Sequence, residues 1–304
     1  MQQISYFDFC TKEGLDLYIS KARSNADLFN KIFHFSPEGF RKKNPKFKVS
    51  GEDNVKIIRE ISQITRLPLE LVEGINLGDE ILHSQGLPEG FGCTSVSLDG
   101  VIAQTLDLFT VDLSLVKEQD ALYVTMPPYL TLMGMNKHIS FCTNVVAGPV
   151  QGGIPVSHMR RDLLRCKSLN ETLDYLKSIE RATSVNFLIS DGRNVVDAEV
   201  TTSNVNVYGS VENKNGIKYC AHTNHLVHPD FLSDNSCSRL KRAVSLLKKS
   251  KNLDFILQDS HINVPIFYQQ EIGFGSILQI IMDVGNGKLC YKDPFMKNYG
   301  ELQL

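Results

Sequence analysis

The sequence has no excess of charge of either sign, because 32 lysine and arginine residues face 34 aspartate and glutamate residues, a formal net charge of −2. A balanced charge provides no general attraction to nucleic acid or to an anionic membrane surface. The sequence also lacks any apolar run near the roughly 18 residues that a membrane-spanning helix needs. Its start, Met1–Ser5, lacks the basic and then apolar pattern of a signal peptide. We therefore expect a cytoplasmic protein with no nucleic-acid and no membrane partner.

Two further absences concern phosphate and metal binding. The sequence contains no Gly-x-x-x-x-Gly-Lys phosphate loop and no Cys-x-x-Cys pair. Its cysteines are odd in number and scattered, which disfavours both a disulfide framework and a zinc ribbon. We expect no metal and no cofactor, and reduced cysteines that act mostly as small buried apolar residues. The seven cysteines are Cys10, Cys93, Cys142, Cys166, Cys220, Cys237 and Cys290.

The character of the sequence changes near residue 92. Residues from about 13 to 90 show apolar spacings of three and four, which indicate helices, one of them running from Pro68 through Ile81. From Cys93 onward short β-prone runs dominate. Strands and helices in separate groups predict an α+β protein with helices packed on antiparallel sheets. We interpret residues 1–92 as a helical N-terminal segment and 93–304 as a β-rich catalytic part, which together form one structural domain.

Several elements can be assigned beyond residue 92. The dipeptide Asp99-Gly100 between two β-prone runs is a strong signal for a two-residue hairpin. The expected strands cover 94–98, 101–108, 121–126, 139–146, 184–189, 195–201, 217–221 and 277–284. The expected helices cover 157–166, 169–179 and 238–249.

The local sequence with the most chemical content is Gly92-Cys93-Thr94, where a Gly/Pro-rich loop enters the first hairpin strand. Glycine before the cysteine permits strained backbone geometry and leaves its carbonyl open to attack. The thiol of Cys93 could then take over the acyl group of Gly92, and hydrolysis of the ester would cut the chain at that bond. Cys93 would become an N-terminal residue that carries both a nucleophile and an amine with a reference pKa of about 7.7–8.0.

Several segments after Cys93 are informative when they are considered together with this junction. They are Ala103–Asp107, Gly134–Asn136, Phe141–Asn144, Gly153–Pro155, Arg160–Leu164, Arg181–Ser184, Asp197–Glu199 and Ala221–Leu226. Their order resembles the penicillin acyltransferase (isopenicillin N acyltransferase)-like family of autoproteolytic cysteine N-terminal-nucleophile hydrolases. The most specific part is the Gly-Cys-Thr junction combined with His-Thr-Asn-His at residues 222–225.

The resemblance implies a four-layered αββα fold and self-cleavage between Gly92 and Cys93. It implies a small-molecule amide or thioester as substrate, without a cofactor. An acyl-CoA or an amine acceptor as partner, and a homodimer, are left open. Cys93 matches the nucleophile, and Asp107 matches the aspartate that holds the new α-amine. Asn224 matches an asparagine whose side-chain N–H would stabilise an oxyanion, and Asn144 would supply a second donor or shape the pocket.

Other residues admit more than one interpretation. His222, His225 and His228 recur every three residues, but that spacing places neighbours on opposite faces of a strand, which disfavours a metal site. His222 could instead contact substrate, as could Thr94. Arg239 lies in a basic, amphipathic helix that is expected at the surface, although it could also bind an anionic acyl donor such as a coenzyme A phosphate.

Two alternatives to self-processing remain. The first is an uncleaved cysteine hydrolase in which His222 serves Cys93 as base in a papain-like pair. The second is a non-catalytic small-molecule-binding protein on the same fold, which is compatible with Thr105 in place of the asparagine common in the resembled family.

Overall fold

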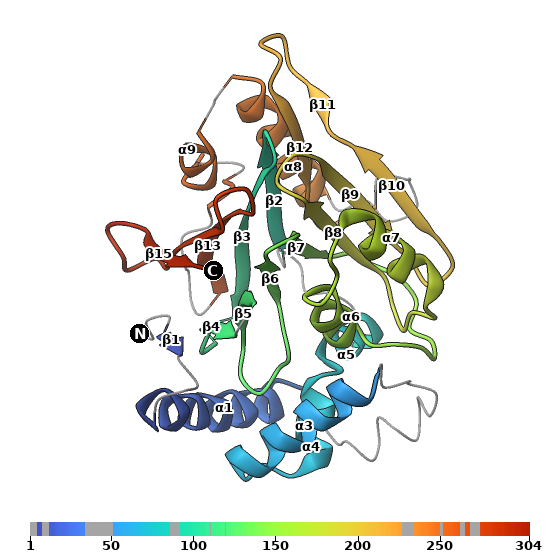
Figure 1. Ribbon diagram of the computed structural model, residues 1–304, viewed down its shortest axis with the longest axis vertical. Helices are drawn as coiled ribbons and strands as arrows, with labels where there is room; N and C mark the ends of the chain where they lie inside the picture. The colour runs from blue at the N-terminus through green and yellow to red at the C-terminus, as the bar shows by residue number, and fades with distance from the viewer. Residues whose placement is uncertain are drawn as a thin grey trace.

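The computed structural model describes residues 5–7, 12–33, 51–85, 92–109, 111–118, 120–226, 234–249, 252–261, 265–267 and 274–304. Two stacked β-sheets form its centre, and helices lie against their outer faces and at one end (Figure 1). The helices are α1 (Lys12–Phe33), α3 (Gly51–Thr65), α4 (Leu69–Ile75), α5 (Gly78–Gln85), α6 (Val156–Leu163), α7 (Leu169–Ser178), α8 (Asp234–Leu247) and α9 (Leu253–Leu257).

One sheet has eight strands and the other seven, and their strands pair antiparallel except β1 with β4. The first sheet runs β1 (Ser5–Phe7), β4 (Ser114–Glu118), β5 (Ala121–Thr125), β6 (Met133–Asn136), β7 (Ser140–Val145), β8 (Val185–Ser190), β9 (Val195–Val200) and β10 (Val205–Gly209). The second runs β11 (Val211–Glu212), β12 (Lys218–His222), β2 (Gly92–Leu98), β3 (Val101–Phe109), β13 (Phe274–Asp283), β14 (Lys288–Lys292) and β15 (Gly300–Gln303).

Alternation along the strands creates the layers. In β7, Cys142 belongs to the core between the sheets, whereas Phe141 packs outward against α6 and α7. In the second sheet, Ile102 faces the inter-sheet core, whereas Val96 packs outward against α8 and α9. Successive side chains of a strand point to opposite faces, so each sheet feeds two cores. The result is helix, sheet, sheet, helix, and the predicted α+β, four-layered αββα fold is confirmed.

The N-terminal helices gather at one end of the sheets, at the bottom of the view in Figure 1. They are not isolated there, because Ala26 and Phe29 of α1 and Ile75 and Ile81 of α4 and α5 belong to the same apolar cluster as the inter-sheet residues. Within the described residues, no helix combines the length and the apolar character needed to cross a bilayer.

The hairpin at Asp99-Gly100 forms as predicted, with Leu98 paired to Val101 and a positive φ at both turn residues. The single helix predicted from Pro68 through Ile81 is wrong, because α4 ends at Ile75 and α5 begins at Gly78. Asn76 causes the break. Its buried side chain donates to the carbonyls of Val72 (2.9 Å) and Pro128 (3.2 Å) and accepts from the N–H of Leu130 (2.8 Å).

Candidate active site

Cys93 is the second residue of β2, in the middle of the seven-stranded sheet, and only 4% of its surface is exposed. Beside it, the neighbouring strand β12 ends at His222, which pairs with Ser95. The backbone of Cys93 therefore extends beyond the last residue of β12. At this position the backbone of Cys93 is contacted by side chains and not by a continuation of β12.

Three side chains hold the backbone of Cys93. Its N–H donates to Oδ1 of Asn224 (2.6 Å), and its carbonyl oxygen accepts from Nδ2 of Asn144 (3.0 Å) and Nη1 of Arg239 (2.8 Å). Asn144 comes from β7 of the opposite sheet and Arg239 from helix α8. The structure thus brings Cys93, Asn144, Asn224 and Arg239 together, although up to 146 residues separate them in the chain.

The orientation of Asn224 differs from the sequence expectation. Its Oδ1 faces two donors, the N–H of Cys93 and Nη2 of Arg239 (2.9 Å), while its Nδ2 donates to the carbonyl of Val145 (2.9 Å). Two donors fix which end of an amide faces them, because only the oxygen can accept. In the uncleaved chain Asn224 thus holds the amide nitrogen of Cys93 through Oδ1, and one N–H of the side-chain amide that the sequence suggested for an oxyanion donates to Val145.

Arg239 also departs from its predicted surface position. Helix α8 is amphipathic as expected, with Ala243 and Leu247 against the sheet, but Arg239 is turned inward and is only 3% exposed. Besides Cys93 and Asn224 it donates to Oγ1 of the buried Thr94 (3.0 Å). With these contacts made, the guanidinium binds the protein's own chain, which argues against the coenzyme A phosphate contact and against a substrate contact for Thr94.

Asp107 lies opposite Gly92 in the β2–β3 pairing. Its Oδ1 accepts a hydrogen bond from the hydroxyl of Ser276 on β13 (2.6 Å). Burial raises the pKa of Asp107 to about 6, even though the charge of Arg239 and the Ser276 hydrogen bond act to lower it. The carboxyl group next to the Gly92–Cys93 bond can therefore gain or lose a proton near neutral pH.

The thiol of Cys93 is held in its protonated form. Burial and, to a lesser extent, the nearby Asp107 carboxylate raise its pKa to about 12, against the opposing effects of the Asp107 backbone N–H, Arg239 and Gln104. Because the thiolate is the nucleophilic form of cysteine, chemistry at Cys93 in the uncleaved chain requires a group that takes the thiol proton.

His222 belongs to a separate, buried cluster. Its Nδ1–H donates to the carbonyl of Thr223 (2.6 Å) and its Nε2–H to Oε1 of Glu199 (3.3 Å). Burial alone would lower the pKa of His222, but the carboxylates of Asp197 and Glu199 raise it overall. A doubly donating imidazolium has no lone pair with which to take a proton. The structure therefore gives no support to His222 as the base of a papain-like pair or as a substrate contact.

His228 lies outside the described residues. Among the residues that are described, no three His, Cys, Asp or Glu side chains are grouped so that they could hold a metal ion.

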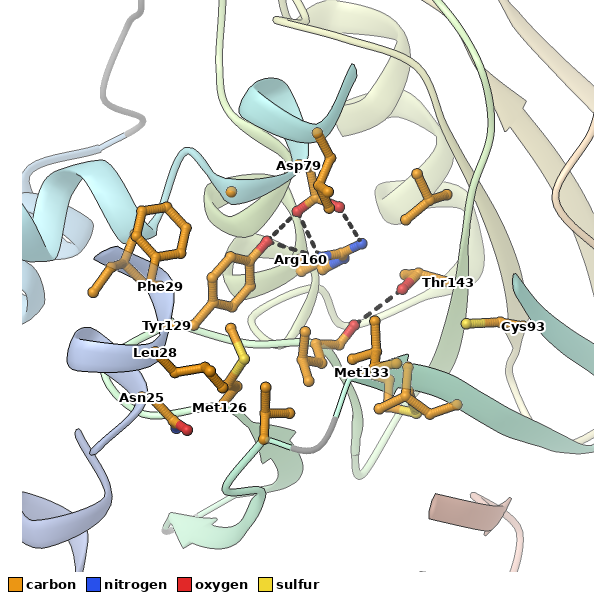
Figure 2. A pocket seen from close by; sticks show the side chains of 18 residues that line it. Asn25, Leu28, Phe29, Asp79, Cys93, Met126, Tyr129, Met133, Thr143 and Arg160 are labelled. Atoms are coloured by element: carbon orange, nitrogen blue, oxygen red, sulfur yellow. Dashed lines mark hydrogen bonds and ion pairs between the residues drawn. The ribbon is translucent and has the colours of Figure 1, made fainter. Parts of the chain in front are cut away.

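An apolar pocket with a volume of about 110 Å³ opens beside the Cys93 thiol. Figure 2 shows Cys93 on one side of it and Phe29 and Tyr129 on the other. The pocket is lined mostly by apolar side chains of the inter-sheet layer and of helices α1, α4 and α5: Leu28, Phe29, Ile75, Leu82, Leu106, Leu108, Val111, Met126, Leu132, Met133 and Val145. It is thus a site for an apolar group within reach of a cysteine.

A buried ion pair in the pocket wall is the main feature that sequence reasoning missed. Arg160 of α6 donates to both carboxylate oxygens of Asp79 (3.0 and 3.1 Å) and to the hydroxyl of Tyr129 (2.8 Å), and Tyr129 donates to Asp79 (Figure 2). Arg160 stands in a segment noted for the family resemblance, but nothing in its local pattern indicates a partner 81 residues away. Ser276, the partner of Asp107, was missed for the same reason.

The layered αββα arrangement, with a cysteine at the start of a central strand, is the fold of N-terminal-nucleophile hydrolases, a class of amide hydrolases and acyltransferases. The model of the family described as acyl-coenzyme A:6-aminopenicillanic acid acyl-transferase matches residues 121–289, more than half of the chain. The chain belongs to this family. Asn144, Asn224 and Arg239 lie within the matched range, and Cys93 and Asp107 precede it.

Solved structures similar to this chain are enzymes by description. The N-acylethanolamine-hydrolyzing acid amidase ortholog of Caenorhabditis elegans is 14% identical, with 64% of this chain and 93% of that chain covered and a TM-score of 0.47. A mutant conjugated bile acid hydrolase from Clostridium perfringens is 14% identical, with coverages of 70% and 92% and a TM-score of 0.48. Penicillin V acylase from Agrobacterium tumefaciens is 11% identical, with coverages of 70% and 86% and a TM-score of 0.49. The comparison with curated proteins found no match.

Proposed function

We propose that the chain is a self-processing cysteine amidohydrolase or acyltransferase with Cys93 as its nucleophile. The observation that carries this proposal is the junction itself. The backbone of Cys93 is held by the side chains of Asn224, Asn144 and Arg239, next to a titratable carboxyl group and at the wall of an apolar pocket. An ordinary buried strand cysteine requires none of these.

Self-cleavage would proceed in two steps. A water molecule passes the proton of the Cys93 thiol to Asp107, whose carboxyl group lies on the opposite face of the sheet. Sulfur attacks the carbonyl carbon of Gly92, and the Gly92–Cys93 C–N bond breaks as its nitrogen takes that proton. Water then hydrolyses the thioester, which leaves a carboxylate on Gly92 and a free thiol and α-amine on Cys93. Oδ1 of Asn224, which accepts from this nitrogen before cleavage, and the Asp107 carboxylate would hold the new amine.

Acyl transfer would reuse the same atoms. The Cys93 α-amine, with a reference pKa of about 7.7–8.0, takes the thiol proton while sulfur attacks the acyl carbon of an amide or thioester. The departing amine or thiol leaves with that proton, and water or an amine then attacks the acyl-Cys93 intermediate. Hydrolysis and transfer differ only in which molecule attacks last, so an acyl-CoA donor and an amine acceptor both belong to the proposal.

The segment before the junction is proposed to stay bound after cleavage. Ala26, Phe29, Ile75 and Ile81 contribute apolar surface to the central core, and separation would expose that surface to water. Residues 1–92 and 93–304 would thus remain one structural unit of two chains. Six cysteines among the described residues are free thiols, which suits the reducing cytoplasm that we propose as the location.

The test is the mass of the purified protein under denaturing conditions. We expect the wild type to separate into residues 1–92 and 93–304, and Cys93→Ala to stay whole. Cys142→Ala is the matched control, since Cys142 is also fully buried in the inter-sheet core, and it should cleave like the wild type. A wild type that stays whole after long incubation, or a Cys93→Ala variant that cleaves, would refute the proposal.

The pH dependence of self-cleavage tests the role of Asp107. Only the ionised carboxylate can take the thiol proton, so the rate should rise about tenfold per pH unit up to the Asp107 pKa of about 6 and then level off. Freshly synthesised precursor, shifted into buffers of different pH and followed by gel electrophoresis, provides the rates. Asp107→Asn should remove the break in the profile together with most of the rate.

Ser276→Ala is the companion variant for this profile. It deletes the hydrogen bond that lowers the Asp107 pKa, so the break should move to higher pH while the final rate changes little. A wild-type rate that keeps rising tenfold per unit well above pH 6 would show instead that solvent forms the thiolate directly.

A further inference from the structure

The end of the pocket farthest from Cys93 is built by residues that precede the proposed cleavage bond. Phe29 of α1 and Gly78 of α5 line the pocket together with Tyr129, while Cys93 lines its other side. Figure 2 shows Phe29 and Tyr129 across the pocket from the Cys93 side chain. An acyl group attached to the Cys93 sulfur would therefore extend toward these helices.

Gly78 leaves space at this end. A Cβ placed on Gly78 would lie 3.8 Å from a ring carbon of Phe29 and 3.8 Å from a ring carbon of Tyr129, ordinary van der Waals distances. Gly78 is the first residue of α5 and needs no left-handed backbone. A side chain at residue 78 is thus sterically permitted, and anything longer than a methyl group would occupy space that the pocket now leaves open between the two rings.

The wall around Gly78 is firmly held. Its neighbour Asp79 is bound to Arg160 by two hydrogen bonds and accepts a third from Tyr129, and all three residues are buried. The positive charge of Arg160 is matched by the negative charge of Asp79, so the wall offers no net charge to a charged end group. A buried, multiply bonded wall keeps a fixed position, whereas a wall of flexible side chains would adapt to each ligand.

We infer that Gly78 sets the length of the acyl group that the enzyme accepts, an uncharged apolar chain whose end lies between Gly78, Phe29 and Tyr129. The inference rests on the proposed function for the position of the acyl carbon at Cys93. It assigns to the segment before the cleavage bond a part in substrate selection, in addition to its part in the core.

The substitution Gly78→Leu tests this inference. A leucine side chain displaces about three to four chain carbons, and each methylene kept out of the pocket lowers affinity about fourfold. The preferred straight-chain acyl group should therefore become shorter by about three carbons, with the longest chains losing at least tenfold and the shortest nearly unchanged. The probes are fluorogenic coumarin amides of straight-chain acids for turnover, and straight-chain fatty acids that displace a fluorescent fatty acid from the Cys93→Ala precursor for binding.

Three companion variants calibrate the result. Gly78→Ala should give a smaller shift in the same direction, and Phe29→Leu should lengthen the preferred chain by opening the same end. Gly209→Leu is the control, since a Cβ at Gly209 meets no atom within 4 Å and β10 does not line the pocket. If Gly78→Leu fails to fold, the other two variants still test the inference, because Gly78→Ala should shorten the preferred acyl chain and Phe29→Leu should lengthen it. Equal chain-length profiles in both variants would overturn the inference.

The outcomes separate the inference from the proposed function. Normal self-cleavage and acylation with an unchanged chain-length profile in Gly78→Leu refute the inference and leave the function intact. A shifted binding profile in the Cys93→Ala precursor, in a chain whose wild type neither cleaves nor turns over amides, supports the length-setting role and refutes the function.

Discussion

Replacing Gly92 by alanine is expected to slow self-cleavage at least a hundredfold. The alanine Cβ would lie 2.9 Å from Cζ of Arg239, closer than real Cβ contacts, and nearer still to Nη2 of Arg239. It would also lie 3.0 Å from Oδ1 of Asn224, which is a tight contact. Arg239 cannot move aside freely, because it is buried and bonded to the Cys93 carbonyl and to Thr94. Losing two such charge-assisted hydrogen bonds costs about 3–6 kcal/mol, and about 3 kcal/mol already corresponds to a hundredfold slower step.

The rate of precursor disappearance in a cell-free synthesis reaction measures this effect. Gly209→Ala is the control for the loss of glycine flexibility alone, since a Cβ there meets no atom, and it should cleave at the wild-type rate. Circular dichroism of the uncleaved Gly92→Ala protein should show a native fold. A Gly92→Ala precursor that cleaves as fast as the wild type would mean that the Arg239 contacts do not position the reacting bond.

The second large effect concerns stability. We expect Arg160→Met to lower the free energy of unfolding by about 3–5 kcal/mol, because it leaves the Asp79 carboxylate buried without its counter-charge. The side chains of Arg160 and Asp79 are 3% and 7% exposed, so water cannot compensate. Urea unfolding in the Cys93→Ala background, in which the chain is expected to remain one piece, gives the free energy directly.

Two control variants test whether the unpaired buried charge causes the loss of stability. Asp79→Leu combined with Arg160→Met removes both charges and should recover much of the loss, as replacement of whole buried ion pairs often does. Lys137→Met breaks the pair with Asp120, whose side chains are 61% and 60% exposed, and should change stability by less than about 1 kcal/mol. If Arg160→Met resembles Lys137→Met, the Asp79–Arg160 pair contributes little to the fold.

Features encoded by near neighbours in the sequence were predictable. The Asp99-Gly100 turn and the two strands around it depend on residues within a short window, and in the structure this hairpin sets Asp107 opposite Gly92. The α+β class followed from the grouped strands and helices, and the four-layered αββα arrangement followed from the resemblance.

Features that depend on distant partners were not predictable. At the break after Ile75, Asn76 donates a hydrogen bond to Pro128 and accepts one from Leu130, both more than fifty residues away. Arg239 resembles any arginine of an amphipathic helix until β2 supplies a carbonyl for it to bind. The orientation of the Asn224 amide depends on two donors that come from different elements. One-dimensional patterns carry no information about such pairings.

The order in which the chain is made gives the junction a further property. Cys93 leaves the ribosome long before Arg239, which follows it by 146 residues, and before Asn144, which comes from the opposite sheet. A nascent chain that has exposed Cys93 but not yet helix α8 lacks the groups that hold the bond. Self-cleavage as proposed therefore cannot begin until α8 has been made and has folded, so every cut chain has already brought its two sheets and α8 together.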